Sequence, residues 1–122
     1  MEQNKEKTNL SQGRSYPFGL KVIRLFHTIS KQGEFILSKQ LVRSGTSIGA
    51  NVEEALAAQS RKDFISKMSI ASKEARETNY WIRLLRDSGV YGEIDFSGLL
   101  DESDQLIKIL TSIVKTSQTK PN

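Results

Sequence analysis

The segment that decides the fold reads RSGTSIGANVEEA and spans residues 43–55. It lies inside a longer amphipathic pattern, yet small residues stand where Leu, Glu and Lys would be expected in a helix. Gly45 and Gly49 are four residues apart, and each lowers helix stability by about 1 kcal/mol relative to Ala. Close approach by a second helix would offset this loss. The segment therefore predicts a place where helices meet.

Helical periodicity continues on both sides of this segment. The helix that contains it is expected from about Phe35 to about Gln59. An earlier helix is expected to begin after Pro17, which suits a first helical turn, and to end at Gly33. Its expected apolar residues are Leu20, Ile23, Phe26 and Ile29.

A third helix has the clearest pattern. Ser60 and Asp63 resemble a capping box in which Asp replaces Glu. Apolar and small residues then recur at alternating four- and three-residue steps, which is typical of a helix with one buried stripe. The positions are Phe64, Met68, Ala71, Ala75, Thr78, Ile82 and Leu85. Gly89 supplies the stop.

A fourth helix is expected to begin between residues 95 and 97 and to bury Leu99, Ser103, Leu106, Leu110 and Ile113. Because the connections between the first three helices are only a few residues long, neighbouring helices are expected to be antiparallel. The sequence therefore predicts an all-α, up-down-up-down four-helix bundle over residues 16–117. The polar, aperiodic residues 1–15 and 118–122 are expected to be disordered.

Composition excludes several classes of function. The chain of 122 residues fits one domain, and it has no Cys for disulfides or thiolate metal sites. His27 is the only histidine, so one chain cannot form a two-histidine metal site, and we expect it to flank the core of the first helix. Since no signal peptide, membrane-spanning run or catalytic motif is apparent, we expect a cytoplasmic protein that does not contact the membrane, has no cofactor and is not an enzyme.

Two blocks of this sequence carry a family resemblance. Residues 43–55, followed by KDFI at 62–65 and ARETNYWIRLL at 75–85, closely resemble four-helix-bundle proteins first noticed as reading frames inside intervening sequences of bacterial 23S ribosomal RNA genes. The resemblance implies a homopentameric ring of antiparallel bundles. A related branch, the accessory proteins of diversity-generating retroelements, implies binding to nucleic acid and to a reverse transcriptase. No enzymatic activity is implied.

The small-residue segment has two possible explanations. Its glycines let the helix approach a neighbour within the same bundle, or they mark an interface with another subunit. An aromatic residue at the edge of the third helix could serve either purpose, by widening the core or by anchoring an oligomer. The candidate helix-crossing or interface residues are Gly45, Ile48, Gly49, Asn51, Val52 and Trp81.

Charge is unevenly distributed along the chain, whose net charge is +4. The basic set comprises Arg14, Lys21, Arg24, Lys31, Lys39 and Arg43, with Glu34 as the one acid among them. The acidic set comprises Asp87, Glu93, Asp95, Asp101, Glu102 and Asp104. The two sets could pair between neighbouring subunits of a ring, or the basic set could contact the phosphates of RNA or DNA.

Two functional hypotheses follow from these patterns. In the first, the chain is a homo-oligomeric scaffold whose basic surface binds RNA, DNA or an associated polymerase. In the second, it is a purely structural oligomer that binds a protein partner through an apolar edge or a central pore.

Overall fold

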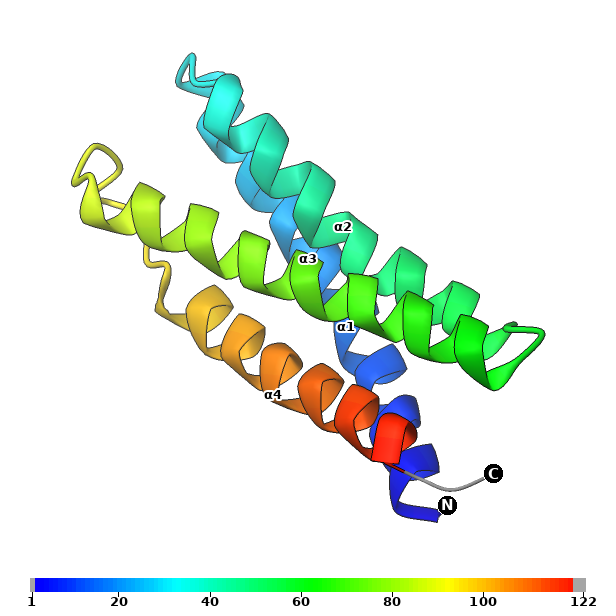
Figure 1. Cartoon of the computed structure of the whole chain (residues 1–122). Coiled ribbons are helices and arrows are strands. Elements are labelled where there is room, and N and C mark those ends of the chain that lie inside the picture. Colours follow the sequence, from blue (N-terminus) through cyan, green and yellow to red (C-terminus); the bar gives the residue numbers. More distant parts are fainter. Residues whose placement is uncertain (1, 120–122) are drawn as a thin grey trace.

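The computed structural model describes residues 2–119 as four α-helices (Figure 1). They are α1 (Glu2–Lys31), α2 (Ile36–Leu56), α3 (Arg61–Asp87) and α4 (Ser97–Thr119). This range contains no strand, so the predicted all-α, four-helix architecture is confirmed. None of its helices combines the length and the apolar character that crossing a membrane requires.

The helices pack in a closed square. Each helix packs against its neighbours in sequence, and α1 also packs against α4, whereas within residues 2–119 no Cα atom of one helix lies within 8 Å of a Cα atom of the diagonally opposite helix. The start of α1 and the end of α4 lie at the same end of the molecule (Figure 1), where Asn4 Nδ2 donates to Ser117 Oγ over 3.1 Å. Further along, Lys21 reaches Glu102. Residue numbers therefore rise along α1 as they fall along α4.

The core consists of one buried stripe from each helix, together with Tyr91 and Phe96 from the connection between α3 and α4. In α3 the predicted stripe is buried at six of its seven positions, and Phe64 is half-buried. In α2 the buried residues include Leu41, Ser44, Ile48, Val52 and Ala55, which likewise recur at three- and four-residue steps. The alternating four- and three-residue steps thus identify the inner faces of these two helices correctly.

A layer of hydrogen-bonded polar side chains interrupts the apolar core. Thr78 Oγ1 lies 2.8 Å from Ser44 Oγ, which links α3 to α2. Asn79 Nδ2 donates to Ser103 Oγ over 2.8 Å, which links α3 to α4. All four residues are buried. The three hydroxyl groups also donate to backbone carbonyls of their own helices, whereas Asn79 Nδ2 donates to side chains of α4. A shift in the register of α3 against α4 would therefore leave the Asn79 amide without these partners, at a cost of about 1–3 kcal/mol.

The prediction for the N-terminal region is wrong. Residues 1–15 were expected to be disordered, but α1 begins at Glu2 and includes Pro17 in its interior. The core stripe of α1 continues backwards through Ser15, Ser11 and Thr8, all of which are buried. Their hydroxyl groups donate to backbone carbonyls of the same helix, so small polar residues can occupy core positions.

The expected apolar face of α1 is also wrong. The buried residues are Phe18, Val22, Leu25 and Ile29, so only Ile29 was identified correctly. Leu20 and Ile23 are 38% and 47% exposed. The reason is that the stripe set by Thr8, Ser11 and Ser15 continues in four- and three-residue steps to Phe18 and Val22, which turns Leu20 and Ile23 outward.

The helix ends follow the turn chemistry of the sequence. The backbone N–H of Asp63 donates to Ser60 Oγ over 3.0 Å, which confirms the predicted cap of α3. Gly33 and Gly89 have positive φ angles of 92° and 72° and end α1 and α3. Differences are small elsewhere: α2 ends at Leu56 rather than near residue 59, and α4 extends to Thr119. Residue 1 and residues 120–122 lie outside the described residues.

Candidate functional site

Gly45 lies where α2 packs tightly against α1. It is buried, and a Cβ placed on it would lie 2.7 Å from Val22 Cγ1. Ile48 and Val52, which follow it on the same helix, are fully buried in the core. These three members of the candidate set therefore pack within the chain.

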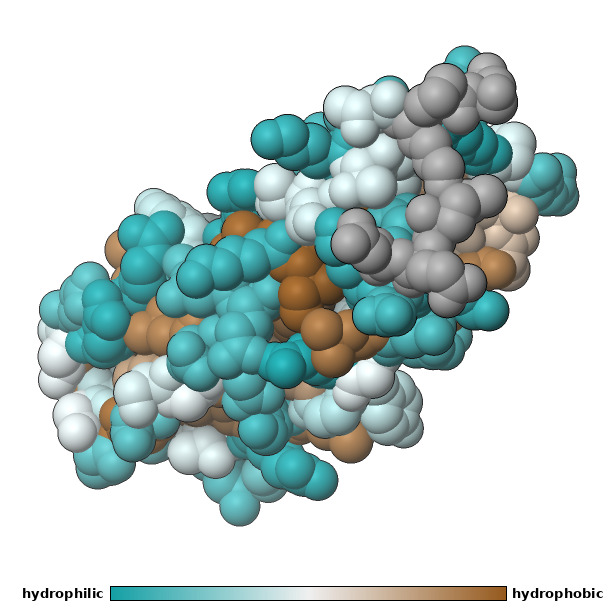
Figure 2. Space-filling model, turned by 90° about the horizontal axis from the view of Figure 1, so that it is seen from below, coloured by the Kyte–Doolittle hydropathy of each residue, from teal (hydrophilic) through white to brown (hydrophobic). Residues whose placement is uncertain are grey.

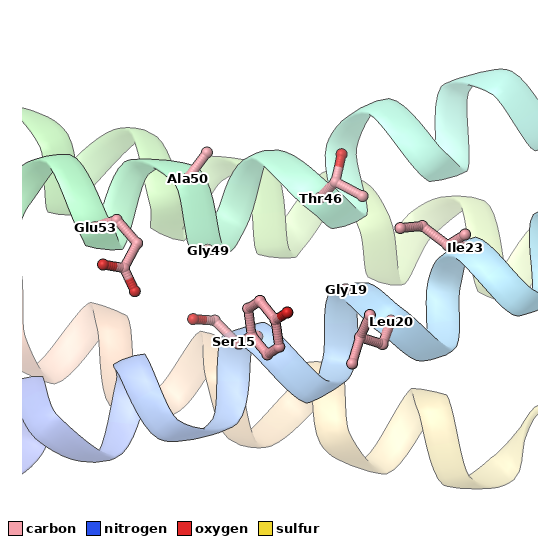
Figure 3. Close-up of a pocket in the computed structure, with 9 residues that line it drawn as sticks. Ser15, Gly19, Leu20, Ile23, Thr46, Gly49, Ala50 and Glu53 are labelled. Atoms are coloured by element: carbon pink, nitrogen blue, oxygen red, sulfur yellow. The ribbon is translucent and has the colours of Figure 1, made fainter.

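Gly49 lies in a different environment. A Cβ placed there would be 3.4 Å from Ser15 Oγ, an ordinary contact distance, and the residue is only half-buried. It lines an open groove of about 290 Å³ on the outer surface between α1 and α2, which we call the α1/α2 groove (Figure 3). The groove is lined by Ser15, Tyr16, Gly19, Leu20, Ile23, Thr46, Gly49, Ala50 and Glu53.

The α1/α2 groove is mainly apolar and accessible. Tyr16 is 70% exposed, and Leu20 and Ile23 lie beside it on α1. Figure 3 shows Leu20 and Ile23 on α1 and Thr46 and Ala50 on α2 across a narrow gap. Such a surface, wide enough for side chains and floored by small residues, is typical of protein contact sites.

The remaining two candidate interface residues lie outside this groove. Asn51 is half-buried, and its Nδ2 donates to the Ser47 carbonyl over 2.8 Å within α2. Trp81 is half-buried on α3, where its Nε1–H donates to Glu77 Oε2 over 2.9 Å. Neither Asn51 nor Trp81 therefore lines the α1/α2 groove.

Trp81 belongs to an exposed edge of α3. Its ring meets Tyr80 in an edge-to-face arrangement with centroids 5.2 Å apart, and the Arg83 guanidinium lies 5.7 Å from the Tyr80 centroid. Leu84 is 38% exposed one turn further on. We call Tyr80, Trp81 and Leu84 the α3 edge. Hydrophobic residues also reach the surface in strips on the face shown in Figure 2.

An ion-pair cluster joins α2 to this part of α3. Arg43 contacts the carboxylates of Glu74, at 3.5 Å, and of Glu77. The Trp81 hydrogen bond outweighs partial burial and, together with Arg43, lowers the pKa of Glu77 below its ordinary value. Arg43 is thus engaged within its own chain.

The structure divides the predicted basic set into two groups. Lys21 Nζ lies 2.7 Å from Glu102 Oε2, Arg14 donates to Gln105 and Arg43 pairs with acids on α3. Arg24, Lys31 and Lys39 are exposed and make no salt bridge with any residue that the structure describes. These three lie in the halves of α1 and α2 that adjoin the Gly33 turn, and we call them the turn-end basic patch.

The acidic set is largely used within the chain as well. Besides Glu102, Asp87 pairs with Arg86 at 2.7 Å, and Asp104 accepts a hydrogen bond from Asn79. Asp95 accepts from the backbone N–H and the hydroxyl of Ser97 at the start of α4, which lowers the pKa of Asp95. Fewer charged side chains are therefore free to pair between the basic and acidic surfaces of two subunits than the sequence suggests.

Sequence analysis missed a second basic surface, between α3 and α4. Lys73, Arg76 and Lys115 line an open groove of about 260 Å³ together with Ser69, Ser72 and Thr111. We call it the α3/α4 groove. A signal for it exists in the sequence, because residues 105–119 contain two lysines and no acid. The cations of α3 and α4 are far apart along the chain, so only the fold shows that they are neighbours.

Metal binding has no obvious location in the described part of the chain. Among residues 2–119 no three His, Cys, Asp or Glu side chains are grouped so that they could hold an ion. His27 is exposed on α1 and does not flank the core as the sequence analysis predicts.

Comparison with known proteins gives a consistent result. The sequence matches the family described as 23S rRNA-intervening sequence protein over residues 8–112. The structure is similar to a 1.70 Å crystal structure of a protein of unknown function from the S23 ribosomal protein family of Bacteroides thetaiotaomicron. The two are 43% identical with a TM-score of 0.80, over 89% of this chain and 98% of the other. No curated protein matches the chain.

Proposed function

Because this chain belongs to the 23S rRNA-intervening sequence protein family, we propose that it is a non-enzymatic, homo-oligomeric scaffold that binds RNA or DNA. In this proposal each protomer is an antiparallel up-down-up-down bundle and five protomers form a ring. The opposite progression of contacting residues along neighbouring helices supports the antiparallel arrangement. The number of subunits rests on the family resemblance.

The α1/α2 groove supports self-association. Leu20, Ile23 and Tyr16 are large side chains left exposed by the bundle, and Ala50 and Gly49 beside them leave room for side chains of another protomer. Burying such a surface in an oligomer is favourable by about 25 cal/mol per Å² of apolar area. A heterologous contact of this kind closes into a ring when its rotation permits.

The observation that carries nucleic-acid binding is the turn-end basic patch. Arg24, Lys31 and Lys39 are exposed cations with no acidic partner in the described residues, and the nearby Glu34 is occupied at the start of α2. Cations without protein partners are free to replace the counterions of phosphate groups. Repetition of the patch around an oligomer multiplies a weak contact.

Fluorescence anisotropy with labelled single-stranded RNA and with double-stranded DNA tests this proposal. We expect binding that weakens steeply as salt rises from about 50 to about 200 mM. The triple variant R24Q/K31Q/K39Q is expected to bind more weakly and with a shallower salt dependence. Absence of binding to both nucleic acids at the lowest salt would refute the proposed function.

The α3 edge favours a second candidate function, recognition of a protein partner such as a reverse transcriptase. Exposed Tyr and Trp side chains, held in place by hydrogen bonding and ring contacts, are typical of the residues that dominate protein interfaces. Capture from nuclease-treated lysate distinguishes the two candidates. A protein partner persists after nuclease treatment and is lost with L84E, whereas a partner bridged by nucleic acid is lost after nuclease alone.

A further inference from the structure

The α3/α4 groove differs from the other basic surface of the molecule in its chemistry. Its cations are Lys73, Arg76 and Lys115, and hydroxyl groups of Ser69, Ser72 and Thr111 lie among them. No Asp or Glu lines it. A surface of cations and hydroxyl donors without acids suits an anionic ligand rather than an apolar one.

Charges are segregated across α3 in a way that leaves this groove positive. The acids Glu74 and Glu77 lie on the side of α3 that faces α2, where both contact Arg43. On the opposite side, Arg76 Nη2 donates to Thr111 Oγ1 of α4 over 3.1 Å. Glu74 and Glu77 are therefore paired on the other side of α3. The cations that line the groove have no acidic partner there.

The second half of α4 adds to the same effect. The acids of α4 are Asp101, Glu102 and Asp104, which all lie near the start of this helix. Residues 105–119 contain no acid. Asp104 is engaged with Asn79. Lys73 and Lys115 make no salt bridge with the part of the chain that the structure describes, so both can contact a ligand without first breaking an ion pair.

Several donors in the groove are positioned but not fully used. Ser72 Oγ lies 3.4 Å from Thr111 Oγ1, and the two hydroxyls together with Arg76 form a short line of donors across the groove. The hydroxyl of Ser69 makes no hydrogen bond within residues 2–119. These groups match the phosphate contacts of nucleic-acid-binding proteins, in which Arg, Lys and Ser or Thr side chains bind the backbone oxygens.

We propose that the α3/α4 groove is a second contact site for a nucleic acid, which binds the phosphodiester backbone through Lys73, Arg76, Lys115 and the adjacent hydroxyls. The inference rests on the proposed function and specifies a surface separate from the turn-end basic patch, since the groove is lined by residues of α3 and α4, whereas the patch lies on α1 and α2. The groove contains no aromatic side chain on which a base could stack. Recognition there is therefore expected to be independent of sequence.

The test compares two triple variants that remove equal charge from the assembled protein. K73Q/R76Q/K115Q alters the groove, and K5Q/K62Q/R86Q serves as the matched control, because these three cations are exposed and belong neither to the groove nor to the turn-end basic patch. Anisotropy is measured with labelled single-stranded RNA and double-stranded DNA of mixed sequence over a salt series. We expect the groove variant to bind about tenfold more weakly or worse, and its salt slope to fall by about 0.7 to 0.9 for each phosphate group that it no longer neutralises.

A variant that leaves the net charge unchanged distinguishes direct contacts in the groove from general electrostatic attraction. Removal of the hydroxyl in S69A is expected to weaken binding severalfold at constant salt while the salt slope stays unchanged. Circular dichroism is used to check that each variant is folded, and light scattering is used to check that its oligomeric state is the same as that of the wild type.

Each outcome has one meaning. Weaker binding by both the groove variant and S69A supports the inference. If the wild type binds but the groove variant binds equally well, or only as weakly as its loss of net charge predicts from the control, the inference is overturned and the proposed function stands. If the wild type binds neither nucleic acid, both the inference and the proposed function fail.

Discussion

At the scale of single residues, the two glycines of the 43–55 segment have different surroundings. Gly45 is enclosed by Val22 of α1 within the same chain, whereas Gly49 faces the open α1/α2 groove. The sequence alone left intramolecular and intermolecular packing open for both. Both glycines lie on the side of α2 that faces α1, but Gly45 is buried in the core and Gly49 lies near the surface. The sequence does not show how deeply each position is buried, so it could not assign the two glycines to different kinds of contact.

Gly45→Ala is expected to destabilise the bundle. Its Cβ would lie 2.7 Å from Val22 Cγ1 and 2.9 Å from Val22 Cγ2, so the helices must move apart or Val22 must shift. Overpacking of this kind costs about 1–3 kcal/mol of unfolding free energy. Urea denaturation monitored by circular dichroism measures the change.

Gly13→Ala is the matched control for this substitution. Gly13 also lies within a helix, but a Cβ there would meet nothing within 4 Å. We therefore expect the unfolding free energy to rise by up to about 1 kcal/mol through helix propensity. Equal effects of the two substitutions would contradict the close approach at Gly45.

At the scale of elements, the start of α2 depends on one carboxylate. Glu34 accepts hydrogen bonds from the backbone N–H groups of Ile36, Leu37 and Ser38 at 2.8–3.0 Å. Partial burial raises the pKa of Glu34, but these bonds outweigh it, so the pKa lies below its ordinary value. The helix start is thereby tied to the charged form of this side chain.

The stability of the bundle is expected to depend on pH through Glu34. Because the folded-state pKa is lowered, the contribution is complete above the ordinary glutamate pKa of about 4.3 and is lost as pH falls through the folded-state value. Glu34→Gln should therefore be less stable than wild type at neutral pH, by about 0.5–2 kcal/mol, and the difference should shrink in acid. Urea midpoints across pH measure it.

Glu93→Gln controls for loss of a carboxylate. Glu93 is exposed in the connection before α4 and makes no hydrogen bond within the described residues. Its substitution should leave the urea midpoint nearly unchanged both at neutral pH and in acid. A pH-independent difference between Glu34→Gln and wild type would show that the charge of Glu34 does not stabilise α2.

Most helices could be predicted from the sequence, and the exception has a physical reason. In α2 and α3, apolar residues and small residues such as Ala, Ser and Thr recur at core spacing, so the buried stripe is visible. In the first half of α1, the buried positions are Thr8, Ser11 and Ser15, whose hydroxyls are satisfied by the helix backbone. A hydropathy pattern does not detect burial of this kind, and it therefore assigned Leu20 and Ile23 to the core.

At the scale of the whole molecule, the outward turn of Leu20 and Ile23 provides the α1/α2 groove. Sequence reasoning located the small residues of α2 that floor this groove but not its apolar wall on α1. The basic set was likewise only partly informative. Which cations remain free depends on ion pairs between helices, such as Lys21 with Glu102, and these pairs depend on register.

Ile23→Glu is expected to dissociate the proposed oligomer while the bundle stays folded. Ile23 is 47% exposed in the protomer, so a carboxylate there is tolerated by the isolated chain but is costly in an apolar interface. Leu10→Glu is the control, because Leu10 is 44% exposed on the same helix and outside the groove. Light scattering should give a reduced mass for Ile23→Glu only. A reduced mass for neither variant would exclude the groove as an interface.

We propose that this protein is an oligomer that binds nucleic acid. Sedimentation velocity of the protein with fluorescently labelled single-stranded RNA, at low salt, tests both parts in one measurement. We expect the RNA to sediment with a protein assembly several times heavier than the 13.7 kDa chain, with five chains as the expected number. Free RNA beside a species with the mass of a single chain would contradict it.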